Sequence, residues 1–399
     1  MKVVAFLATH AGFVGPKIQA RNQGLAEQHV PHFDQCLWVH CASLGEFEQG
    51  KVLVDALRAQ FPKKKIVLTF FSSSGYEKRK NYGMVDSVLY LPYDTPESME
   101  ELIGQINPQL VVFIKYEFWF TLLDSLSKRD IPFVFVSAVF RPSQYLFFPL
   151  FSSLKQRILK AEHIFVQNNE SLDLLRSHGY DSVTVAGDTR IDRVLEIRKQ
   201  TFEWAALDDW VRGHTVVIGG STWPKDESFI SLVISQYPGW KWILAPHDIS
   251  PGHMDQIRTV FGDSLLFYTE LEESRPMADD VHILIIDQIG LLSSLYRYGH
   301  IAYIGGGHGA GIHNTLEPAV YGLPLIFGPR YTKFQEAVDF TLNDTARVIR
   351  SKSELATALD HFSQPSVQDK VARLHRAYFD QRSGAVDQIM NTITEIIAL

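Results

Sequence analysis

Cysteine is scarce in this chain of 399 residues, which contains only Cys36 and Cys41. Both lie in one apolar run, and their odd spacing places them on opposite faces of a strand, where they cannot pair with each other. The disulfide framework that is typical of small secreted domains is therefore excluded, and we expect a reducing compartment.

Long hydrophobic runs and an excess of positive charge are missing too. No stretch approaches the ~20 apolar residues that span a bilayer, and the early run 3–14 is shorter and contains His10. The start lacks the basic flank and small-residue cleavage site of a secretory signal. The net charge of −7 argues against nucleic-acid binding driven by overall charge. We expect a protein that faces the cytosol and has no nucleic-acid partner.

The chain does contain enough apolar sequence for two cores. Its hydrophobic content is 46%, and its length exceeds the ~250–300 residues at which single cores stop growing. Short β-rich runs alternate with segments of helical length, which indicates βαβ units on parallel sheets. The expected strands are 36–41, 65–70, 87–91, 110–114, 132–136, 164–166 and 183–185, then 215–218, 241–245, 265–268, 283–286, 301–304 and 325–327.

A polar stretch at 192–213 separates the two sets of strands. We therefore predict an α/β protein with two doubly wound Rossmann-like domains, residues 1–205 and 206–399, and a cleft between them. The last ~35 residues look helical and are candidates to pack back on the first domain.

The strongest local signal is a run of five glycines in seven positions, residues 305–311, directly after the expected strand 301–304. Glycine lets backbone N–H groups approach an anion closely, and the helix start that follows adds its positive end. We interpret Gly306 and Gly307 as part of a phosphate site, with a flexible glycine turn as the alternative. The loop is not a Walker A motif, because no Gly-Lys-Ser/Thr follows.

Further polar residues gather at the carboxyl ends of strands in the second domain, where doubly wound sheets bind ligands. Ser221 and Thr222 follow the first of these strands, and Pro246 and His247 follow the second. A lone histidine is more often structural than a ligand contact, so the placement of His247 matters more than its identity.

Asn314 and Glu317 are three residues apart, which places them on one face of a helix beside the glycine loop. Glu317 is a candidate to accept hydrogen bonds from ribose hydroxyls. The alternative is a glutamate that serves only the helix dipole.

The first domain offers two candidate catalytic carboxylates. Glu46 follows the first clear strand and the turn residue Gly45, so it is a candidate general base, although a first-turn helix carboxylate is an equal alternative. Glu48 points elsewhere and is expected to be solvated. Glu117 ends a strongly apolar run, where burying a carboxylate is costly unless it is paired, and this favours a functional role.

Arg190 follows another strand end and can neutralise a carboxylate or a phosphate. The alternative is a surface ion pair with Asp188 or Asp192. No group of histidine, cysteine and aspartate has zinc spacing, so we expect neither a metal nor another cofactor.

Taken in order, these segments resemble the 3-deoxy-D-manno-octulosonic acid (Kdo) transferases of lipopolysaccharide synthesis, over residues 17–384. The resemblance rests on Ser-Leu-Gly-Glu at 43–46, Tyr-Glu-Phe-Trp at 116–119, Gly-Asp-Thr-Arg-Ile-Asp at 187–192, Gly-Ser-Thr at 220–222, and His-Asn-Thr-Leu-Glu-Pro at 313–318 with Phe-Gly-Pro at 327–329. It implies a GT-B fold, CMP-Kdo as donor substrate, a lipid A precursor as acceptor, and inversion of the anomeric configuration.

The resemblance also implies roles for residues. Glu46 would be the proton acceptor, with Glu117 and Arg190 supporting the transition state. CMP would contact Pro246 and His247, the turn formed by Ile289, Gly290 and Leu291, and residues 314–317.

Three positions depart from the family pattern. His247 stands in a segment where the family usually has Pro-Arg-His, residues 289–291 read Ile-Gly-Leu in place of Met-Gly-Glu, and Arg190 replaces a lysine. A missing arginine removes a bidentate phosphate contact, because neutral histidine brings less charge and no fork.

The resemblance places the protein at the cytoplasmic face of the inner membrane, held peripherally or by an N-terminal segment missing from this chain. The candidate membrane contacts are the run 3–14 with Lys17 and Arg21, and the aromatic segment 140–151. For the second segment, packing inside the protein is an equal alternative.

Three other functions remain open from the sequence. The chain fits a GT-B transferase that uses a UDP- or GDP-sugar, a sugar-nucleotide epimerase of the same architecture, or a non-catalytic nucleotide-binding scaffold at the membrane. The pocket for the nucleotide base discriminates among the enzymes, whereas the scaffold predicts that Glu46 is dispensable.

Overall fold

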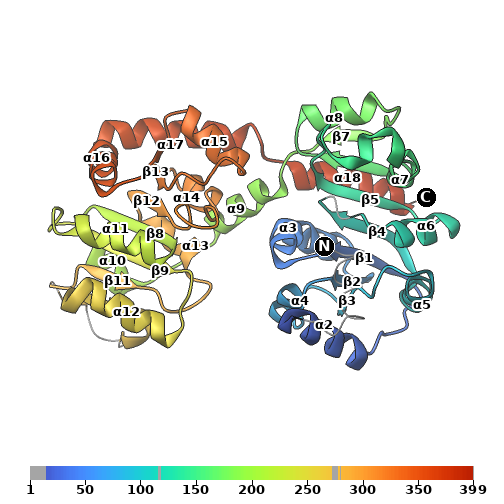
Figure 1. The fold of residues 1–399 in the computed structure, drawn as a ribbon, viewed down its shortest axis with the longest axis horizontal. Coiled ribbons are helices and arrows are strands. Elements are labelled where there is room, and N and C mark those ends of the chain that lie inside the picture. Colours follow the sequence, from blue (N-terminus) through green and yellow to red (C-terminus); the bar gives the residue numbers. More distant parts are fainter. Residues whose placement is uncertain (1–14, 116–117, 272–276, 279, 399) are drawn as a thin grey trace. The chain divides into compact units, whose positions relative to one another are not determined.

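Short, mostly apolar and mostly buried runs form the strands of two parallel sheets. The computed structural model describes residues 15–115, 118–271, 277–278 and 280–398. The chain divides into two compact units, one formed by Met1–Arg193 with Arg382–Leu399 and the other by Val194–Gln381 (Figure 1). The division falls upstream of the boundary expected at residue 205.

The first unit is built on a seven-stranded sheet of order β3-β2-β1-β4-β5-β6-β7, in which every neighbouring pair is parallel. Its strands are β1 (Cys36–Cys41), β2 (Lys65–Phe70), β3 (Ser87–Tyr90), β4 (Pro108–Ile114), β5 (Phe133–Ala138), β6 (His163–Val166) and β7 (Val183–Val185). Its helices are α2 (Pro16–Glu27), α3 (Leu44–Gln60), α4 (Ser73–Arg79), α5 (Pro96–Ile106), α6 (Phe120–Lys128), α7 (Ser152–Ile158), α8 (Asn169–Arg176) and α18 (Ala385–Ala398), with 3-10 turns η1 (Tyr145–Phe147) and η2 (Pro149–Phe151).

The second unit repeats this plan with a seven-stranded sheet of order β10-β11-β9-β8-β12-β13-β14, again parallel throughout. Its strands are β8 (Val216–Thr222), β9 (Lys241–Pro246), β10 (Leu265–Phe267), β11 (Ile283–Ile285), β12 (Ile301–Ile304), β13 (Leu325–Phe327) and β14 (Ala346–Val348). Its helices are α10 (Ala205–Val211), α11 (Pro224–Ile234), α12 (Pro251–Phe261), α13 (Leu292–Leu295), α14 (Leu316–Val320), α15 (Gln335–Leu342), α16 (Lys352–Phe362) and α17 (Pro365–Asp380), with 3-10 turns η3 (Gly262–Ser264), η4 (Tyr268–Glu270) and η5 (Tyr296–Tyr298), while α9 (Thr189–Lys199) runs across the division.

Both faces of the first sheet are covered, which explains why its strands are mostly apolar and do not alternate between apolar and polar residues. All six residues of β1 are buried. Cys36 joins the core on one face and Cys41 joins the core on the other. The two cysteines therefore face opposite sides of the sheet, as predicted, and both thiols are free.

The C-terminal helix α18 belongs to the first unit, as Figure 1 shows. Its apolar side chains Val386, Ile389 and Ile393 enter the same core as Leu37 and Val39 of β1. The Asp192 carboxylate accepts hydrogen bonds from the backbone N–H groups of Gly384 (2.7 Å) and Val386 (2.8 Å), which fixes the start of the helix.

The strand orders confirm the prediction of two doubly wound sheets. In each sheet the order reverses beside the first strand, between β1 and β4 in the first unit and between β8 and β12 in the second. Such switch points are where open α/β sheets bind ligands, at the carboxyl ends of their strands. Among the described helices, none combines the length and the apolarity needed to cross a bilayer.

Candidate functional site

The loops after β8 and β12 meet at the switch point of the second sheet. The N–H of Gly305 donates to the carbonyl of Gly220 over 2.9 Å. A Cβ atom on Gly305 would overlap the carbonyl of Ser221, and one on Gly220 would overlap the hydroxyl of the buried Tyr296. Glycine is needed at both positions because the backbones approach so closely.

Ser221, the residue before the last in β8, has a left-handed conformation with φ of 50°, which is uncommon for a residue other than glycine. Lys115, just after β4, and Ser137, near the end of β5, share this property with φ of 67° and 55°. Backbone strain of this kind clusters at functional sites. It occurs here near the carboxyl ends of strands, where both sheets were expected to bind ligands.

One buried carboxylate holds the two loops of the second unit in place. Asp226, in the first turn of α11, is only 1% exposed. It accepts hydrogen bonds from the N–H of Trp223 (3.0 Å), the N–H of Gly306 (2.9 Å) and the hydroxyl of Tyr303 (2.8 Å). The sequence reasoning missed Asp226, although an acidic residue three positions after the residue that caps a helix, here Trp223, is a recognisable helix-start signal.

Thr222 faces the interior and not the open edge of the sheet. Its side chain is fully buried, and its hydroxyl donates to Glu227 over 3.0 Å. The same Glu227 oxygen lies 3.1 Å from Nε2 of His253. Burial raises the pKa of Glu227. Thr222 thus stabilises the interior next to the carboxyl edge of the sheet. Of the two residues, only Ser221 lies at the edge itself.

Several N–H groups of the glycine loop form hydrogen bonds within the protein and do not point freely toward a ligand. The N–H groups of Gly309 and Gly311 both donate to the carbonyl of Gly306, over 2.9 and 3.1 Å. The N–H of Gly306, expected to face a phosphate, is taken by Asp226. Gly307 is buried, and a Cβ atom there would lie 2.5 Å from the backbone nitrogen of Gly328. Packing alone therefore requires glycine at position 307, and the part of Gly307 in a phosphate site stays a prediction.

Three aromatic rings stack at the same edge of the sheet. Trp223 and His247 lie with ring centroids 4.6 Å apart and planes 17° apart, and the His247 and His313 centroids are also 4.6 Å apart. The rings come from the loops after β8, β9 and β12, so the sheet order brings them together. Trp223 is 40% exposed, which leaves part of the stack open to a ligand.

A hydrogen bond within the stack determines the protonation of the His313 ring. Nε1 of Trp223 donates to Nε2 of His313 over 3.1 Å, so the ring of His313 is neutral and carries its proton on Nδ1. Burial lowers the pKa of His313, and the neighbouring His247 lowers it further. The sequence reasoning selected His247 but missed Trp223 and His313. The position of Trp223, directly after Gly-Ser-Thr at a strand end, was the available signal.

The remaining donor-site candidates lie at the same edge. Asn314 and Glu317 are side by side as expected, with Nδ2 of Asn314 donating to the Glu317 carboxylate over 2.9 Å. Pro246 is buried at the end of β9, and the backbone N–H of His247 donates to the carbonyl of Thr222.

The turn formed by Ile289, Gly290 and Leu291 comes after β11, which is paired with β9. Ile289 is exposed, and Gly290 has a φ of 102° that favours glycine. The turn therefore belongs to the carboxyl edge, while no hydrogen bond among the described residues ties it to the stack.

At the switch point of the first sheet, Glu46 occupies the first turn of α3. Ser43 is the N-cap of this helix, and its hydroxyl accepts the N–H of Glu46. The Glu46 carboxylate in turn accepts the N–H of Ala42 over 2.5 Å, and the residue is 9% exposed. This reciprocal arrangement resembles a capping box, and it fixes the carboxylate at the carboxyl end of β1.

Glu48 is not solvated as expected, which corrects that prediction. It forms ion pairs with Arg79 and Arg193, the first over 2.8 Å. Burial opposes its ionisation, but the two arginines outweigh burial, so the pKa of Glu48 is lowered. The helix turn between Glu46 and Glu48 points the second carboxylate toward α4 and α9.

Arg190 is held by Asp188, which is one of the two partners considered from the sequence. Its Nε and Nη2 lie 2.9 and 2.6 Å from Oδ2 of Asp188, and Gln49 of α3 donates to Oδ1 over 2.9 Å. Burial alone would raise the pKa of Asp188, but Arg190 and Gln49 lower it. Arg190 is thereby fixed beside the helix that carries Glu46. Glu117, the remaining catalytic candidate, lies outside the described residues.

Comparison with known proteins finds a similarity to one family in the first unit. Residues 16–193 match the family described as 3-deoxy-D-manno-octulosonic-acid transferase (kdotransferase). The 3-deoxy-D-manno-octulosonic acid transferase of Haemophilus influenzae is 25% identical over 383 residues, which cover 91% of this chain and 87% of that protein. The chain is similar to Kdo transferases over most of its length. The resemblance found in the sequence motifs is therefore confirmed.

One of the proteins that this chain resembles is much longer. A bifunctional glycosyltransferase/methyltransferase of Fusobacterium nucleatum is 24% identical over 320 residues, and these cover 77% of this chain but only 48% of that protein. The chain thus corresponds to about half the length of that relative.

Solved structures agree on the fold. The UDP-GlcNAc 2-epimerase of Neisseria meningitidis, bound to UDP-GlcNAc, aligns with a TM-score of 0.63 at 15% identity, covering 90% of this chain and all of the epimerase. The predicted GT-B class of two doubly wound domains is confirmed by this likeness and by the two sheets. At such low identity the likeness concerns the fold alone.

Proposed function

We propose that this protein is an inverting glycosyltransferase that transfers Kdo from CMP-Kdo to a lipid A precursor in lipopolysaccharide biosynthesis. The observation that carries the proposal is the placement of Glu46. This carboxylate is held at the switch point of the first sheet, within the segment that matches the Kdo transferase family.

The reaction needs one base and stabilisation of two developing charges. The bond between the anomeric carbon of Kdo and the phosphate oxygen of CMP breaks, and the acceptor hydroxyl oxygen attacks that carbon from the opposite side. Glu46 takes the proton of this hydroxyl, and CMP leaves with the electron pair of the broken bond. One direct displacement inverts the anomeric centre, so no second nucleophile is required.

The stack of Trp223, His247 and His313 supports the carboxyl edge of the second sheet as the site that binds the donor. The exposed part of Trp223 offers a flat surface for the base or the ribose of CMP. The Asn314 and Glu317 pair lies in the segment after the glycine loop and offers polar groups for ribose hydroxyls. His247 stacks on Trp223 where the family pattern has an arginine nearby, so phosphate binding here relies less on a guanidinium.

Release of CMP from CMP-Kdo, measured with and without a lipid A precursor, tests the proposed function. We expect CMP release that depends on the acceptor, together with a product that carries Kdo of inverted configuration. UDP-GlcNAc and a GDP-sugar serve as competing donors in parallel assays. Turnover of either of these donors without turnover of CMP-Kdo would contradict the proposal and favour another GT-B enzyme.

We also propose that the protein works at the cytoplasmic face of the inner membrane, because its acceptor is a lipid. The first candidate contact, residues 3–14, lies outside the described residues. Arg21 is unsuited to bind lipid headgroups, because it is buried and donates to the carbonyls of Phe71 (2.9 Å) and Leu91 (2.7 Å). This corrects the interpretation of Arg21 as part of a membrane contact.

The second candidate segment, 140–151, divides into an inner and an outer side. Phe140 and Leu146 are buried in the core of the first unit, and Phe147 packs against Phe140. Phe148 and Leu150, in contrast, are 48% and 85% exposed. The outer side is therefore the part available to a membrane surface.

Replacing Phe148 and Leu150 together by Ser is expected to weaken sedimentation with anionic liposomes by about tenfold or more, since burying a Leu or Phe side chain contributes ~1.5–3 kcal/mol. The melting temperature should stay nearly unchanged, because both side chains are exposed. Phe147→Ser is the matched control, and it should lower the melting temperature. Unchanged liposome binding by the double variant would show that this segment is not the membrane contact.

A further inference from the structure

Arg330 follows the carboxyl end of β13, beside the glycine loop of the proposed donor site. β13 pairs in parallel with β12, with Phe327 opposite Ile304. The two backbones stay together beyond these strand ends, because the N–H of Arg330 donates to the carbonyl of Gly307 (3.0 Å) and its carbonyl accepts the N–H of Ile312 (3.3 Å). The glycine loop therefore sets the position of Arg330.

The guanidinium of Arg330 reaches the exposed part of this loop. Its Nη1 donates to the carbonyl of Gly309, and both residues are exposed. No carboxylate in the described parts of the chain pairs with this guanidinium. Arginine has several N–H donors in a planar fork, so one hydrogen bond to a carbonyl leaves most of the fork and the positive charge available to an anion.

The residues assigned so far to the donor site bring negative charge but no lysine or arginine. The carboxylates of Asp226 and Glu317 lie at this edge of the sheet, and position 247 supplies a histidine ring where the family pattern has an arginine nearby. The N–H groups of Gly306 and Gly309 already donate within the protein. Because like charges repel, a phosphate at this edge needs a cationic side chain.

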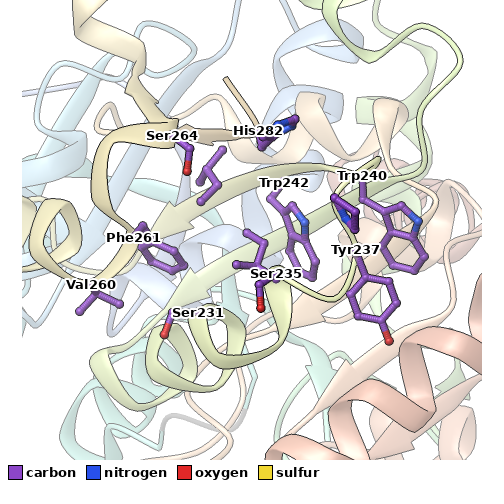
Figure 2. Close-up of a pocket in the computed structure, with 12 residues that line it drawn as sticks. Ser231, Ser235, Tyr237, Trp240, Trp242, Val260, Phe261, Ser264 and His282 are labelled. Atoms are coloured by element: carbon purple, nitrogen blue, oxygen red, sulfur yellow. The ribbon is translucent and has the colours of Figure 1, made fainter. Parts of the chain in front are cut away.

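The cavity drawn in Figure 2 does not provide such a cation. It has a volume of about 250 Å³ and lies at the opposite edge of the second sheet, where β9 and β11 begin and where α11 and α12 end. Its described lining is mainly aromatic and aliphatic, with Trp240, Trp242 and Phe261 among its residues, and it includes neither lysine nor arginine. Burying a phosphate without a paired charge is costly, so an anion is expected at the carboxyl edge and not in this cavity.

We propose that Arg330 binds the phosphate of the nucleotide donor, a role that rests on the proposed transferase function. The guanidinium supplies from the end of β13 the charged fork that position 247 does not supply from the end of β9. Negative charge develops on the phosphate of CMP as the bond to the sugar breaks, so the same contact stabilises the leaving group. The hydrogen bond to Gly309 holds the guanidinium beside the loop before the donor binds.

Titrations of the full-length protein with CMP and with cytidine test this role, because the two probes differ only in the phosphate. Arg330→Gln keeps an N–H donor for the Gly309 carbonyl but removes the charge. Its CMP affinity should fall by about tenfold or more, since hydrogen bonds to charged groups are the stronger ones. Its cytidine affinity and its melting temperature should stay nearly unchanged. Arg330→Lys keeps the charge without the fork and should lose less CMP affinity than Arg330→Gln.

Lys333→Gln is the matched control, because it removes an exposed cation three residues after Arg330, and it should leave CMP affinity unchanged. Unchanged CMP affinity in Arg330→Gln would overturn the proposal, and so would an equal loss of CMP and cytidine affinity, which would leave Arg330 with a structural role in the loop. A defect confined to the KM for CMP-Kdo would assign Arg330 to the carboxylate of the sugar and overturn the phosphate role. Failure of the unaltered protein to bind CMP would instead contradict the proposed transferase function.

Discussion

Glu46→Gln is expected to reduce Kdo transfer by ~10²-fold or more and to leave CMP affinity and the melting temperature nearly unchanged. General base catalysis is typically worth ~10²–10⁴-fold in rate, and an amide cannot take up the proton of the acceptor hydroxyl. Glutamine retains an oxygen that accepts the N–H of Ala42, so the hydrogen bond at the start of α3 is kept. Initial rates with CMP-Kdo and calorimetry with CMP separate the two effects.

Glu48→Gln is the matched control for this experiment, because it removes a carboxylate two residues further along the same helix. Glu48 is paired with Arg79 and Arg193, so this variant should lose some stability but retain transfer. Substantial residual transfer by Glu46→Gln would leave Glu46 with its structural role alone, the reciprocal hydrogen bonds with Ala42 and Ser43.

The sheets could be predicted from the sequence because parallel strands buried on both faces are continuous apolar runs. The predicted limits of β1, β2, β7, β12 and β13 match the observed ones. The strand β14 was missed. It has three residues with Arg347 at its centre, and it lies at the edge of the sheet, where only one neighbour pairs with it. A run this short with a charged residue at its centre gives only a weak strand signal.

The sequence predicted which strand ends carry residues of the candidate site. It did not predict which of these residues contact one another. The stack of Trp223, His247 and His313 depends on β8 lying between β9 and β12, and sequence order alone does not give this arrangement. The glycine loop shows the same limit. Its composition favoured an open anion site, whereas several of its N–H groups donate within the loop or, in the case of Gly306, to Asp226.

One departure from the family pattern, the histidine at position 247, can be understood from this stack. A histidine at position 247 fits between Trp223 and His313 as a flat ring. The ring of His313 accepts the indole N–H, so two members of the stack are bound to each other without any ligand. Donor recognition through a flat, preorganised surface can offset part of the contact that an arginine fork would provide.

Asp226→Ala is expected to lower the free energy of unfolding of the second unit by about 3 kcal/mol or more. It leaves three donors without their acceptor, the N–H groups of Trp223 and Gly306 and the hydroxyl of Tyr303, and each unsatisfied buried group costs ~1–3 kcal/mol. Because the carboxylate joins the loops after β8 and β12, CMP affinity should fall by about tenfold or more as well. Thermal unfolding and calorimetry with CMP measure the two losses.

Asp226→Asn provides the decisive comparison. Its amide oxygen can still accept both backbone N–H groups, which share Oδ2 of Asp226, and the hydroxyl of Tyr303 can rotate to accept from the new NH₂ group. Asn should therefore retain most of the stability and CMP affinity that Ala loses. If Ala and Asn behave alike and both lose CMP binding, the negative charge matters more than the hydrogen bonds. If neither variant loses stability or CMP binding, the two loops are held in place without Asp226, and the donor site does not depend on this carboxylate.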